Sequence, residues 1–366
     1  MYGNSSVTEN RKIEHLKICL ERDVSARQIS TGFGNIHLIH DSISNIDLNE
    51  ISTSIKFLGH ELSMPLLISP MTGGTPEAKK FNGILSKVAE EMRVAIGVGS
   101  VRAALQNPDL RDTYRVVREN APDVPVISNI GLPQVAKNPD MAFEAVSLLD
   151  ADAIFIHLNK LQEVVMREGE PTTAGGLQAI EYLIDNLEVP IILKETGAGI
   201  SREAAETLER IGVKYVDIGG AGGTSFAAVE YYRARNAGDE EKAYLGLSLW
   251  DWGIPTVASL IEVSLSTRLE IICSGGVRTG IDAAKAMSLG AKLVGVALPL
   301  LRAASDGVKG VKEWMQRFHL LLRSTMFLVG ATDISQLRRK PLVVTGFIRE
   351  WMASRGLDPE VYGRRQ

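Results

Sequence analysis

The sequence predicts an α/β protein whose core is a closed (β/α)8 (TIM) barrel. Short apolar segments, several of them rich in Val and Ile, alternate along the chain with stretches of helical periodicity. Each segment is followed by Gly, Ser, Thr or Asn, as buried parallel strands commonly are. An open sheet needs no fixed number of strands, so the count of eight segments favours a closed barrel over an open sheet. They are residues 64–69, 94–98, 125–129, 153–157, 190–194, 214–218, 270–274 and 292–297.

Composition restricts the class of protein. The chain has 366 residues, 45% of them hydrophobic, which suffices for one large core. The net charge of -4 comes without a long basic block, so neither nucleic acid nor an anionic membrane is an expected partner. Cys19 and Cys273 are the only cysteines and make no disulfide or metal pattern. Without a signal-like or membrane-spanning segment, we expect a soluble cytoplasmic protein.

Two regions lie outside the repeating pattern. Residues 1–63 are expected to form an N-terminal extension that packs on the barrel or on a neighbouring subunit, and residues 64–366 the barrel with its C-terminal helical region. The connection after the sixth strand is long. Within it, residues 230–242 are charged and helix-like, and we expect residues 225–250 to cross the barrel mouth as a lid or a subunit contact.

Active sites of such barrels lie at the C-terminal ends of the strands. The strongest candidate there follows the fourth strand, where alternation points His157 and Asn159 into the mouth. Gln162 and Glu163 come directly afterwards. Taken singly, His157 could be a core histidine and Glu163 an acid at a helix start. A histidine, two amides and a carboxylate together indicate a functional site.

Polar residues also end the second, third and fifth strands. Ser100 and Arg102 follow the second, and a guanidinium suits phosphate, although Arg102 could also be a surface arginine. Asn129 ends the third, where an amide suits the edge of a flavin and equally a turn. Lys194 ends the fifth. A Schiff base, a flavin contact and an ion pair with Asp217 all remain open for it.

Glycine-rich loops follow the first, sixth and seventh strands, at residues 72–74, 219–223 and 275–276. Glycine lets the backbone approach a ligand closely. Phosphate groups in this fold commonly bind after strands seven and eight, so the amides of Gly275 and Gly276 would form a cradle. Arg278 either adds charge there or points into solvent. These loops predict a phosphate-bearing cofactor.

Taken in order, these segments resemble the type 2 isopentenyl diphosphate isomerases along most of the chain. The stretch from His157 to Glu163, His-Leu-Asn-x-x-Gln-Glu, is the most specific part. Two positions depart from the family pattern: Phe226 stands where a tryptophan is expected, and Arg167 lies where a proline is expected. The matching segments are Arg11-Lys12, Thr72-Gly73-Gly74, residues 99–102, 157–163, Lys194, residues 222–225, 252–256 and 274–280.

The resemblance implies FMN, Mg2+, a reductant such as NADPH, and isopentenyl diphosphate as the substrate. It implies a homo-oligomer, a tetramer or octamer, in which an N-terminal segment can complete a neighbour's site. It assigns the metal to Glu163 and the substrate to Arg11, Lys12, Ser100, Arg102, His157, Asn159 and Gln162. It assigns FMN to Met71, Thr72, Ser100, Asn129, Lys194, Thr224, Gly275, Gly276, Arg278, Ala297 and Leu298.

Moving a double bond requires protonation of an alkene, which is a very weak base. Gln162 is a neutral amide, and the charge of His157 is better used in binding a diphosphate. Reduced FMN offers both an acid and a base at N5, with Lys194 stabilising charge near N1. We therefore expect Gln162, His157 and Lys194 to surround the reaction.

Other functions remain possible on the sequence. The alternative enzyme is an FMN-dependent oxidoreductase of the 2-hydroxy-acid oxidase type, but the seventh-strand loop offers Arg278 and no nearby histidine. A dihydroorotate-type flavin barrel fits by fold alone. A flavin- or phosphate-binding scaffold without turnover is the non-enzymatic alternative.

Overall fold

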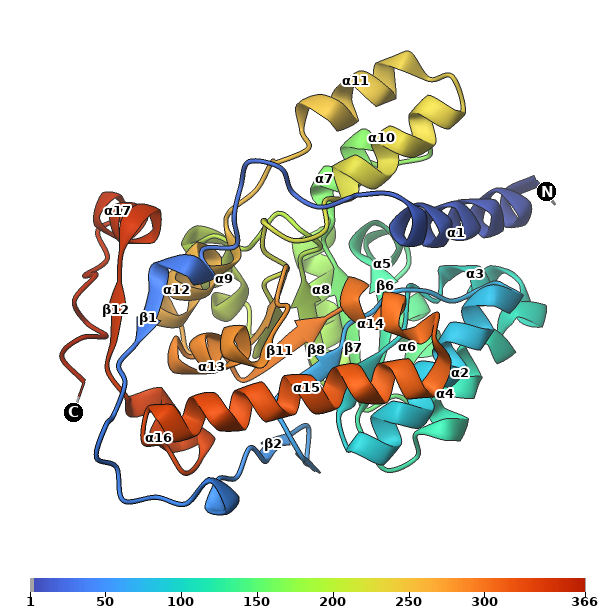
Figure 1. The fold of residues 1–366 in the computed structure, drawn as a ribbon. Helices are drawn as coiled ribbons and strands as arrows, with labels where there is room; N and C mark the ends of the chain where they lie inside the picture. Colours follow the sequence, from blue (N-terminus) through green and yellow to red (C-terminus); the bar gives the residue numbers. More distant parts are fainter. Residues whose placement is uncertain (1–2, 366) are drawn as a thin grey trace.

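The computed structural model describes residues 3–365, with side chains from residue 10 onward. Eight parallel strands form a closed barrel in chain order, and the last pairs with the first (Figure 1). The predicted barrel is confirmed, and each predicted segment overlaps one strand. The strands are β4 (Leu66–Ile68), β5 (Ala95–Gly97), β6 (Val126–Gly131), β7 (Ala153–His157), β8 (Ile191–Lys194), β9 (Tyr215–Asp217), β10 (Glu270–Ser274) and β11 (Leu293–Val296).

Alternation along the strands divides the core into two layers. In β7, Ala153 and Phe155 belong to the cluster that fills the barrel interior, whereas Ile154 and Ile156 pack in the layer beneath the helices. The predicted orientation of this strand is confirmed. It brings His157, the last residue of β7, to the mouth.

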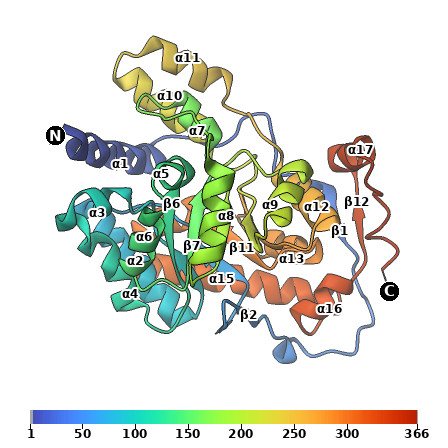
Figure 2. The ribbon, with the colours of Figure 1, turned by 180° about the vertical axis from the view of Figure 1, so that it is seen from behind.

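Helices cover the outside of the barrel, with α15 (Gly307–Leu328) running along one flank in Figure 1 and α6, α8 and α9 on the opposite side in Figure 2. Besides α15, the covering helices are α2 (Pro76–Met92), α3 (Arg102–Gln106), α4 (Asp112–Asn120), α5 (Leu132–Lys137), α6 (Asp140–Ser147), α8 (Gly176–Asn186), α9 (Arg202–Arg210), α12 (Thr256–Ser266), α13 (Gly280–Ser288), α14 (Leu298–Ala304), α16 (Ile334–Arg339) and α17 (Gly346–Ser354). Short 3-10 turns lie at η1 (Phe33–Asn35), η2 (Leu48–Glu50) and η3 (Pro108–Leu110).

The N-terminal residues contact the barrel at both ends. A hairpin of β2 (Ile55–Phe57) and β3 (His60–Leu62) places Phe57 and Leu62 in the interior cluster, so it closes the end opposite the mouth. Strand β1 (Ile36–Leu38) pairs antiparallel with β12 (Leu342–Val344), near the other end of the chain. The sequence did not predict β12, because three residues carry too little periodicity.

Three helices gather at the mouth: α1 (Gly3–Glu21), α7 (Lys160–Val165) and α10 (Phe226–Asn236) (Figure 1). The charged, helix-like residues 230–242 belong to two helices, because α10 ends and α11 (Glu240–Ser248) begins within them. Gly238 adopts a left-handed φ of 72°, and the Asp239 side chain accepts the backbone N–H of Lys242 at 3.1 Å. A left-handed glycine followed by an N-cap separates two helices.

Within residues 3–365, no helix combines the length and the apolar character that crossing a membrane requires.

Candidate active site

A cavity of about 270 Å³ lies at the C-terminal ends of the barrel strands. Every residue that the sequence analysis assigned to cofactor, substrate or metal lines it. The positions therefore agree with the resemblance, although the separate roles remain proposals. These residues are Arg11, Lys12, Met71, Thr72, Ser100, Arg102, Asn129, His157, Asn159, Gln162, Glu163, Lys194, Thr224, Gly275, Gly276, Arg278, Ala297 and Leu298.

Lys194 points into the mouth from the end of β8. Its Nζ lies 2.7 Å from Oδ2 of Asp217 and 3.3 Å from Oγ of Ser274. The Ser274 hydroxyl in turn donates to the other carboxylate oxygen of Asp217, which is fully buried. The predicted ion pair with Asp217 is confirmed. A fixed, desolvated ammonium suits a ligand that carries negative charge on a flat ring.

The loops after β9 and β10 pack backbone against backbone. A Cβ at Gly275, whose φ is 102°, would lie 2.2 Å from the carbonyl oxygen of Gly220, and a Cβ at Gly223 would lie 2.4 Å from the nitrogen of Gly276. Beside them, the Ser69 hydroxyl lines the cavity, buried and without a hydrogen-bond partner. We call the surface formed by the ends of β4, β9, β10 and β11 the backbone wall. Its bare amides and unpaired hydroxyl fit a flat, phosphate-bearing group such as FMN.

His157 is held in one orientation. The amide nitrogen of Asn129 donates to the Val98 carbonyl at 3.1 Å, so its oxygen, 2.9 Å from Nδ1 of His157, is the acceptor for the ring. Burial, and then the nearby cationic side chains of Lys194, Arg11 and Lys12, lower the pKa of His157 to about 3. The ring is therefore neutral. Its Nδ1 carries the proton and donates to Asn129, and its Nε2 carries none and can accept a hydrogen bond.

Cationic side chains gather on the other side of the cavity. Lys12 donates from Nζ to the Ser100 carbonyl at 2.8 Å and contacts the Tyr114 hydroxyl. Burial, and then Arg11, lower the pKa of Lys12 to about 7. Arg102 joins them from the start of α3. Helix α1 of the same chain thus brings two cations to the cavity, where an anion would relieve their repulsion.

The turn into α7 presents oxygen atoms. Asn159 has a φ of 25°, and its Nδ2 donates to Oε1 of Gln162 at 3.3 Å and Oε1 of Glu163 at 3.2 Å. Its own Oδ1 is buried without a partner. Glu163 accepts the Glu170 backbone N–H at 2.7 Å. Carboxylate and amide oxygens suit Mg2+, which takes its remaining ligands from substrate phosphates and water. No group of three or more His, Cys, Asp or Glu side chains that could hold a metal ion occurs within residues 10–365.

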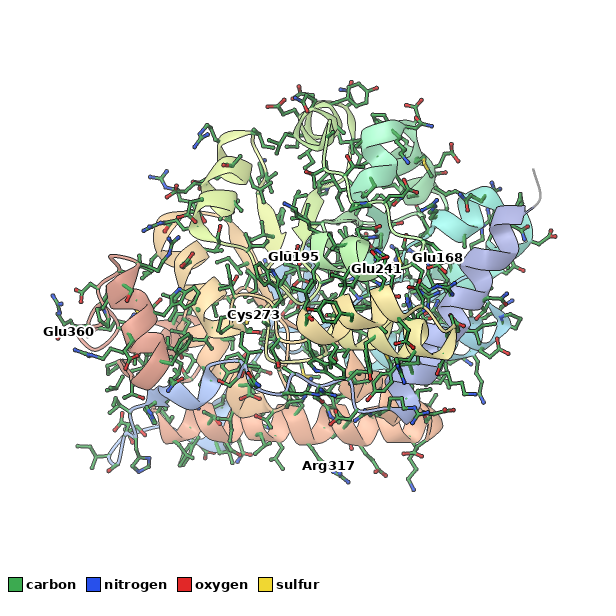
Figure 3. The ribbon with its side chains drawn as sticks, turned by 90° about the horizontal axis from the view of Figure 1, so that it is seen from above. Glu168, Glu195, Glu241, Cys273, Arg317 and Glu360 are labelled. Carbon is green, nitrogen blue, oxygen red and sulfur yellow. The ribbon has the colours of Figure 1, made fainter. Side chains whose placement is uncertain are left out.

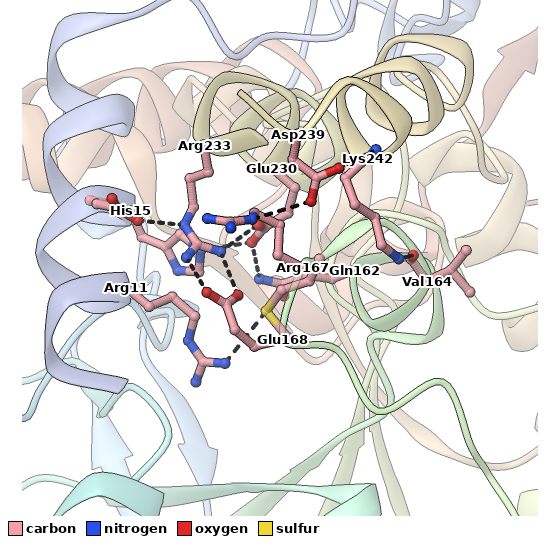
Figure 4. Close-up of polar contacts among 12 residues, drawn as sticks. Arg11, His15, Gln162, Val164, Arg167, Glu168, Glu230, Arg233, Asp239 and Lys242 are labelled. Carbon is pink, nitrogen blue, oxygen red and sulfur yellow. Dashed lines mark hydrogen bonds and ion pairs between the residues drawn. The ribbon is translucent and has the colours of Figure 1, made fainter. Parts of the chain in front are cut away.

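An ionic cluster beside Gln162 was not anticipated from the sequence (Figure 4). Glu230 on α10 accepts from Nε2 of Gln162 at 3.3 Å, lies 2.7 Å from Nε2 of His15, and pairs with Arg233 at 2.7 Å. Arg233 also pairs with Glu168 at 3.0 Å. Burial raises the pKa of Glu230, but His15 and Arg233 outweigh it and hold the pKa at about 2. We call these residues, with Glu14, the α1–α10 cluster.

The α1–α10 cluster joins segments far apart in the chain, which explains why it was missed. One signal was available: Glu230 and Arg233 lie three residues apart on a helix that otherwise buries Ala227, Ala228 and Val229. A charged pair within an apolar helix face indicates a buried partner elsewhere.

The two departures from the family pattern lie at this side of the mouth. Phe226 lines the cavity from the first turn of α10. Arg167 points away from it and pairs with Asp239 at 3.3 Å. Both positions lie in or beside the segments that cover the site.

The fold and the backbone wall define the class of protein. Residues 126–344, more than half of the chain, match the family described as FMN-dependent dehydrogenase, and the chain belongs to it. Solved structures support the fold alone. A mandelate oxidase with (S)-2-phenylpropionate aligns at a TM-score of 0.63 and 17% identity, over 94% of this chain and 99% of that one. A flavocytochrome b2 with sulfite bound aligns at a TM-score of 0.65 and 20% identity, over 90% of this chain and 82% of that one.

Curated relatives identify the particular branch, and the chain belongs to the isopentenyl-diphosphate delta-isomerase family. It is 45% identical to that enzyme of Methanothermobacter thermautotrophicus over 97% of this chain and 99% of the relative. It is 46% identical to the enzyme of Pyrococcus abyssi over 94% of this chain and 95% of the relative. It is also 46% identical to the enzyme of Thermococcus onnurineus, over 99% of this chain and 98% of the relative. The resemblance to the type 2 enzymes is confirmed. The 2-hydroxy-acid oxidases share only the fold at this identity.

Proposed function

We propose that this chain interconverts isopentenyl diphosphate and dimethylallyl diphosphate in isoprenoid biosynthesis. The observation that carries the proposal is one cavity with two unlike walls. The backbone wall, with Lys194, suits a flavin, and it faces Arg11, Lys12 and Arg102, which suit a diphosphate. A 2-hydroxy acid carries one carboxylate and would leave part of this cationic charge uncompensated.

FMN would be held by the residues that line the backbone wall and its rim. When reduced, it supplies an acid and a base for proton transfer. Lys194 places a fixed positive charge beside it, and Asp217 keeps that ammonium in position. The full set is Met71, Thr72, Ser100, Asn129, Lys194, Thr224, Gly275, Gly276, Arg278, Ala297 and Leu298.

The cationic side of the cavity would bind the diphosphate. Arg11, Lys12 and Arg102 would neutralise the diphosphate, and Ser100 and His157 would contact it or the hydrocarbon part of the substrate. A bound anion would raise the proton affinity of His157. Glu163 would hold Mg2+ through its carboxylate, with the unpaired oxygen of Asn159 nearby.

The cavity side chains do not themselves supply a strong acid. The pKa of Glu230, about 2, keeps it ionised at neutral pH, and burial raises the pKa of Cys19 to about 11. His157 is neutral before substrate binds. Gln162, held between Asn159 and Glu230, is placed to orient the reacting carbons rather than to protonate them in its ordinary state.

Three further features belong to the proposal. NADPH would reduce the flavin, and Mg2+ would accompany the substrate. The chain would assemble as a homo-oligomer, a tetramer or octamer, with residues 1–63 as an extension on the barrel. In this structure α1 brings Arg11 and Lys12 to the cavity of its own chain.

An anaerobic assay tests the activity. The purified protein receives FMN, Mg2+, isopentenyl diphosphate, and either dithionite or NADPH, and dimethylallyl diphosphate is measured. We expect product with reduced FMN and none with oxidised FMN. Protein that binds and reduces FMN yet makes no product would contradict the proposal.

A further inference from the structure

The two glycines in the turn after β4 make room for a side chain rather than for a ligand. Met71 and Thr72 line the cavity, but Gly73 and Gly74 do not. A Cβ at Gly73 would lie 2.0 Å from Cε1 of Tyr114, on α4, and a Cβ at Gly74 would lie 3.1 Å from the Tyr114 hydroxyl. The absence of side chains in this turn therefore lets the Tyr114 ring reach the mouth of the barrel.

The Tyr114 hydroxyl is held in place by the barrel and its helices. The Tyr114 side chain is fully buried, and its hydroxyl donates to the Ser100 carbonyl at 2.7 Å. The neighbouring Thr113 hydroxyl accepts the Gly74 backbone N–H at 2.8 Å, and the Thr113 carbonyl accepts from the amide of Asn82, on α2, at 2.8 Å. The start of α4 is thus fastened both to the turn after β4 and to α2, so the hydroxyl has little freedom to move.

This hydroxyl and the Ser100 carbonyl receive Lys12 from α1. Helix α1 lies at the mouth, where it contacts α3 and α10 (Figure 3). The Nζ of Lys12 donates to the Tyr114 hydroxyl and, at 2.8 Å, to the Ser100 carbonyl. Both acceptors are neutral, so neither cancels the charge of the ammonium. An ammonium has three protons to donate, and these two bonds leave one of them for an anion in the cavity.

Neutral acceptors suit this position because the surroundings of Lys12 oppose its charge. Arg11 on the same helix and Arg102 at the start of α3 line the same cavity. Burial, and then Arg11, lower the pKa of Lys12. Hydrogen bonds to oxygen favour the charged form of the ammonium and fix its position. A carboxylate in the place of the Tyr114 hydroxyl would do the same, but it would repel a diphosphate.

We propose that Tyr114 is a positioning residue for Lys12: together with the Ser100 carbonyl, its hydroxyl holds the ammonium at the cavity as an uncompensated charge for the diphosphate. This inference rests on the proposed function. Tyr114 does not itself line the cavity, so it acts through Lys12 and not on the substrate. The Gly73-Gly74 turn serves the site indirectly, because it admits the tyrosine that holds the lysine.

The test uses Tyr114→Phe in the full-length, FMN-loaded protein. Phenylalanine keeps the ring that packs against Gly73 and removes only the hydroxyl. We expect the affinity for inorganic diphosphate with Mg2+, measured by calorimetry, to fall about tenfold, because a hydrogen bond to a charged group is lost. FMN affinity should stay within about twofold, because the backbone wall is untouched. In turnover, KM for isopentenyl diphosphate should rise more than kcat falls.

A double-variant cycle separates positioning of Lys12 from a general loss of stability. In the Lys12→Met background, Tyr114→Phe should no longer change diphosphate affinity, because no ammonium remains to be held. Tyr362→Phe is the matched control: Tyr362 is also buried, at 1% exposure, but lies outside the cavity, so loss of its hydroxyl should leave that affinity unchanged. An equal loss of affinity from Tyr114→Phe with and without Lys12, or no loss at all, would overturn the inference.

Wild-type turnover tests the proposed function separately, because calorimetry with inorganic diphosphate needs no product. A protein that binds diphosphate and loses affinity in Tyr114→Phe as expected, yet forms no dimethylallyl diphosphate, would contradict the proposed function and support the role of Tyr114. Wild-type protein that does not bind diphosphate would contradict both.

Discussion

The two walls of the cavity are built by opposite means. The backbone wall works through the absence of side chains: Gly223, Gly275 and Gly276 let two loops touch, and the buried ion pair of Lys194 and Asp217 lies at its edge. The opposite wall works through ionisable side chains from α1, α3, α7 and α10, which hold one another in place. Substitutions in the backbone wall should therefore change the affinity for FMN. Substitutions in the opposite wall should change the affinity for diphosphate and the stability of the fold around it.

The largest effect should come from Lys194→Ala, which removes the charge of the backbone wall. We expect isomerase kcat/KM to fall about a thousandfold, as when a preorganised electrostatic group is lost. FMN affinity, measured by fluorescence quenching, should fall with it. Asp217 would be left buried and unpaired, so the double variant with Asp217→Asn serves as control: it should recover stability but not activity. Full FMN affinity and rate in Lys194→Ala would contradict the assigned role.

On the opposite wall, Arg233→Ala should destabilise the fold. The Arg233 side chain is 3% exposed and pairs with Glu14, Glu168 and Glu230. Its loss leaves Glu230 buried without its arginine partner, so the free energy of unfolding should fall by about 3 kcal/mol. Urea denaturation measures this. Arg235→Ala, which breaks an exposed pair on the same helix, should change it by less than about 1 kcal/mol.

Gly275→Ala should weaken FMN binding at the backbone wall. Gly275 has a φ of 102°, and its Cβ would meet the Gly220 carbonyl at 2.2 Å. We expect FMN affinity to fall roughly 50-fold through strain and displaced backbone. Gly307→Ala shares the left-handed φ, at 73°, but meets nothing within 4 Å. Equal FMN affinity in the two variants would show that close packing of the loops is unimportant.

The lowered pKa of Lys12 predicts that the affinity for diphosphate, but not the affinity for FMN, depends on pH. Its lowered pKa, about 7, means that the ammonium is present below pH 7 and lost above it. A diphosphate favours the charged form, so binding takes up a proton and affinity should fall by up to about tenfold per pH unit above 7. Calorimetry with inorganic diphosphate at several pH values measures the slope. Lys12→Gln should flatten it, whereas an unchanged slope would assign the titration to another group.

The sequence predicted the backbone wall better than its opposite. Glycine runs after strands are local, and their position in the barrel follows from the strand count, so Gly275 and Gly276 could be placed in advance. The alternation in β7 likewise placed His157. Glu230 and His15 could not be placed, since their contact depends on how α1 and α10 pack.

One cavity that binds both a reduced flavin and a diphosphate should transfer protons without net oxidation. Counting the molecules of product formed per flavin tests this. The protein is loaded with FMN, reduced once, freed of excess reductant and given isopentenyl diphosphate under anaerobic conditions, while the flavin spectrum is followed. We predict many molecules of dimethylallyl diphosphate per flavin and a spectrum that stays reduced. Product limited to one per flavin, or formed only as the flavin is reoxidised, would contradict the claim and indicate an oxidoreductase.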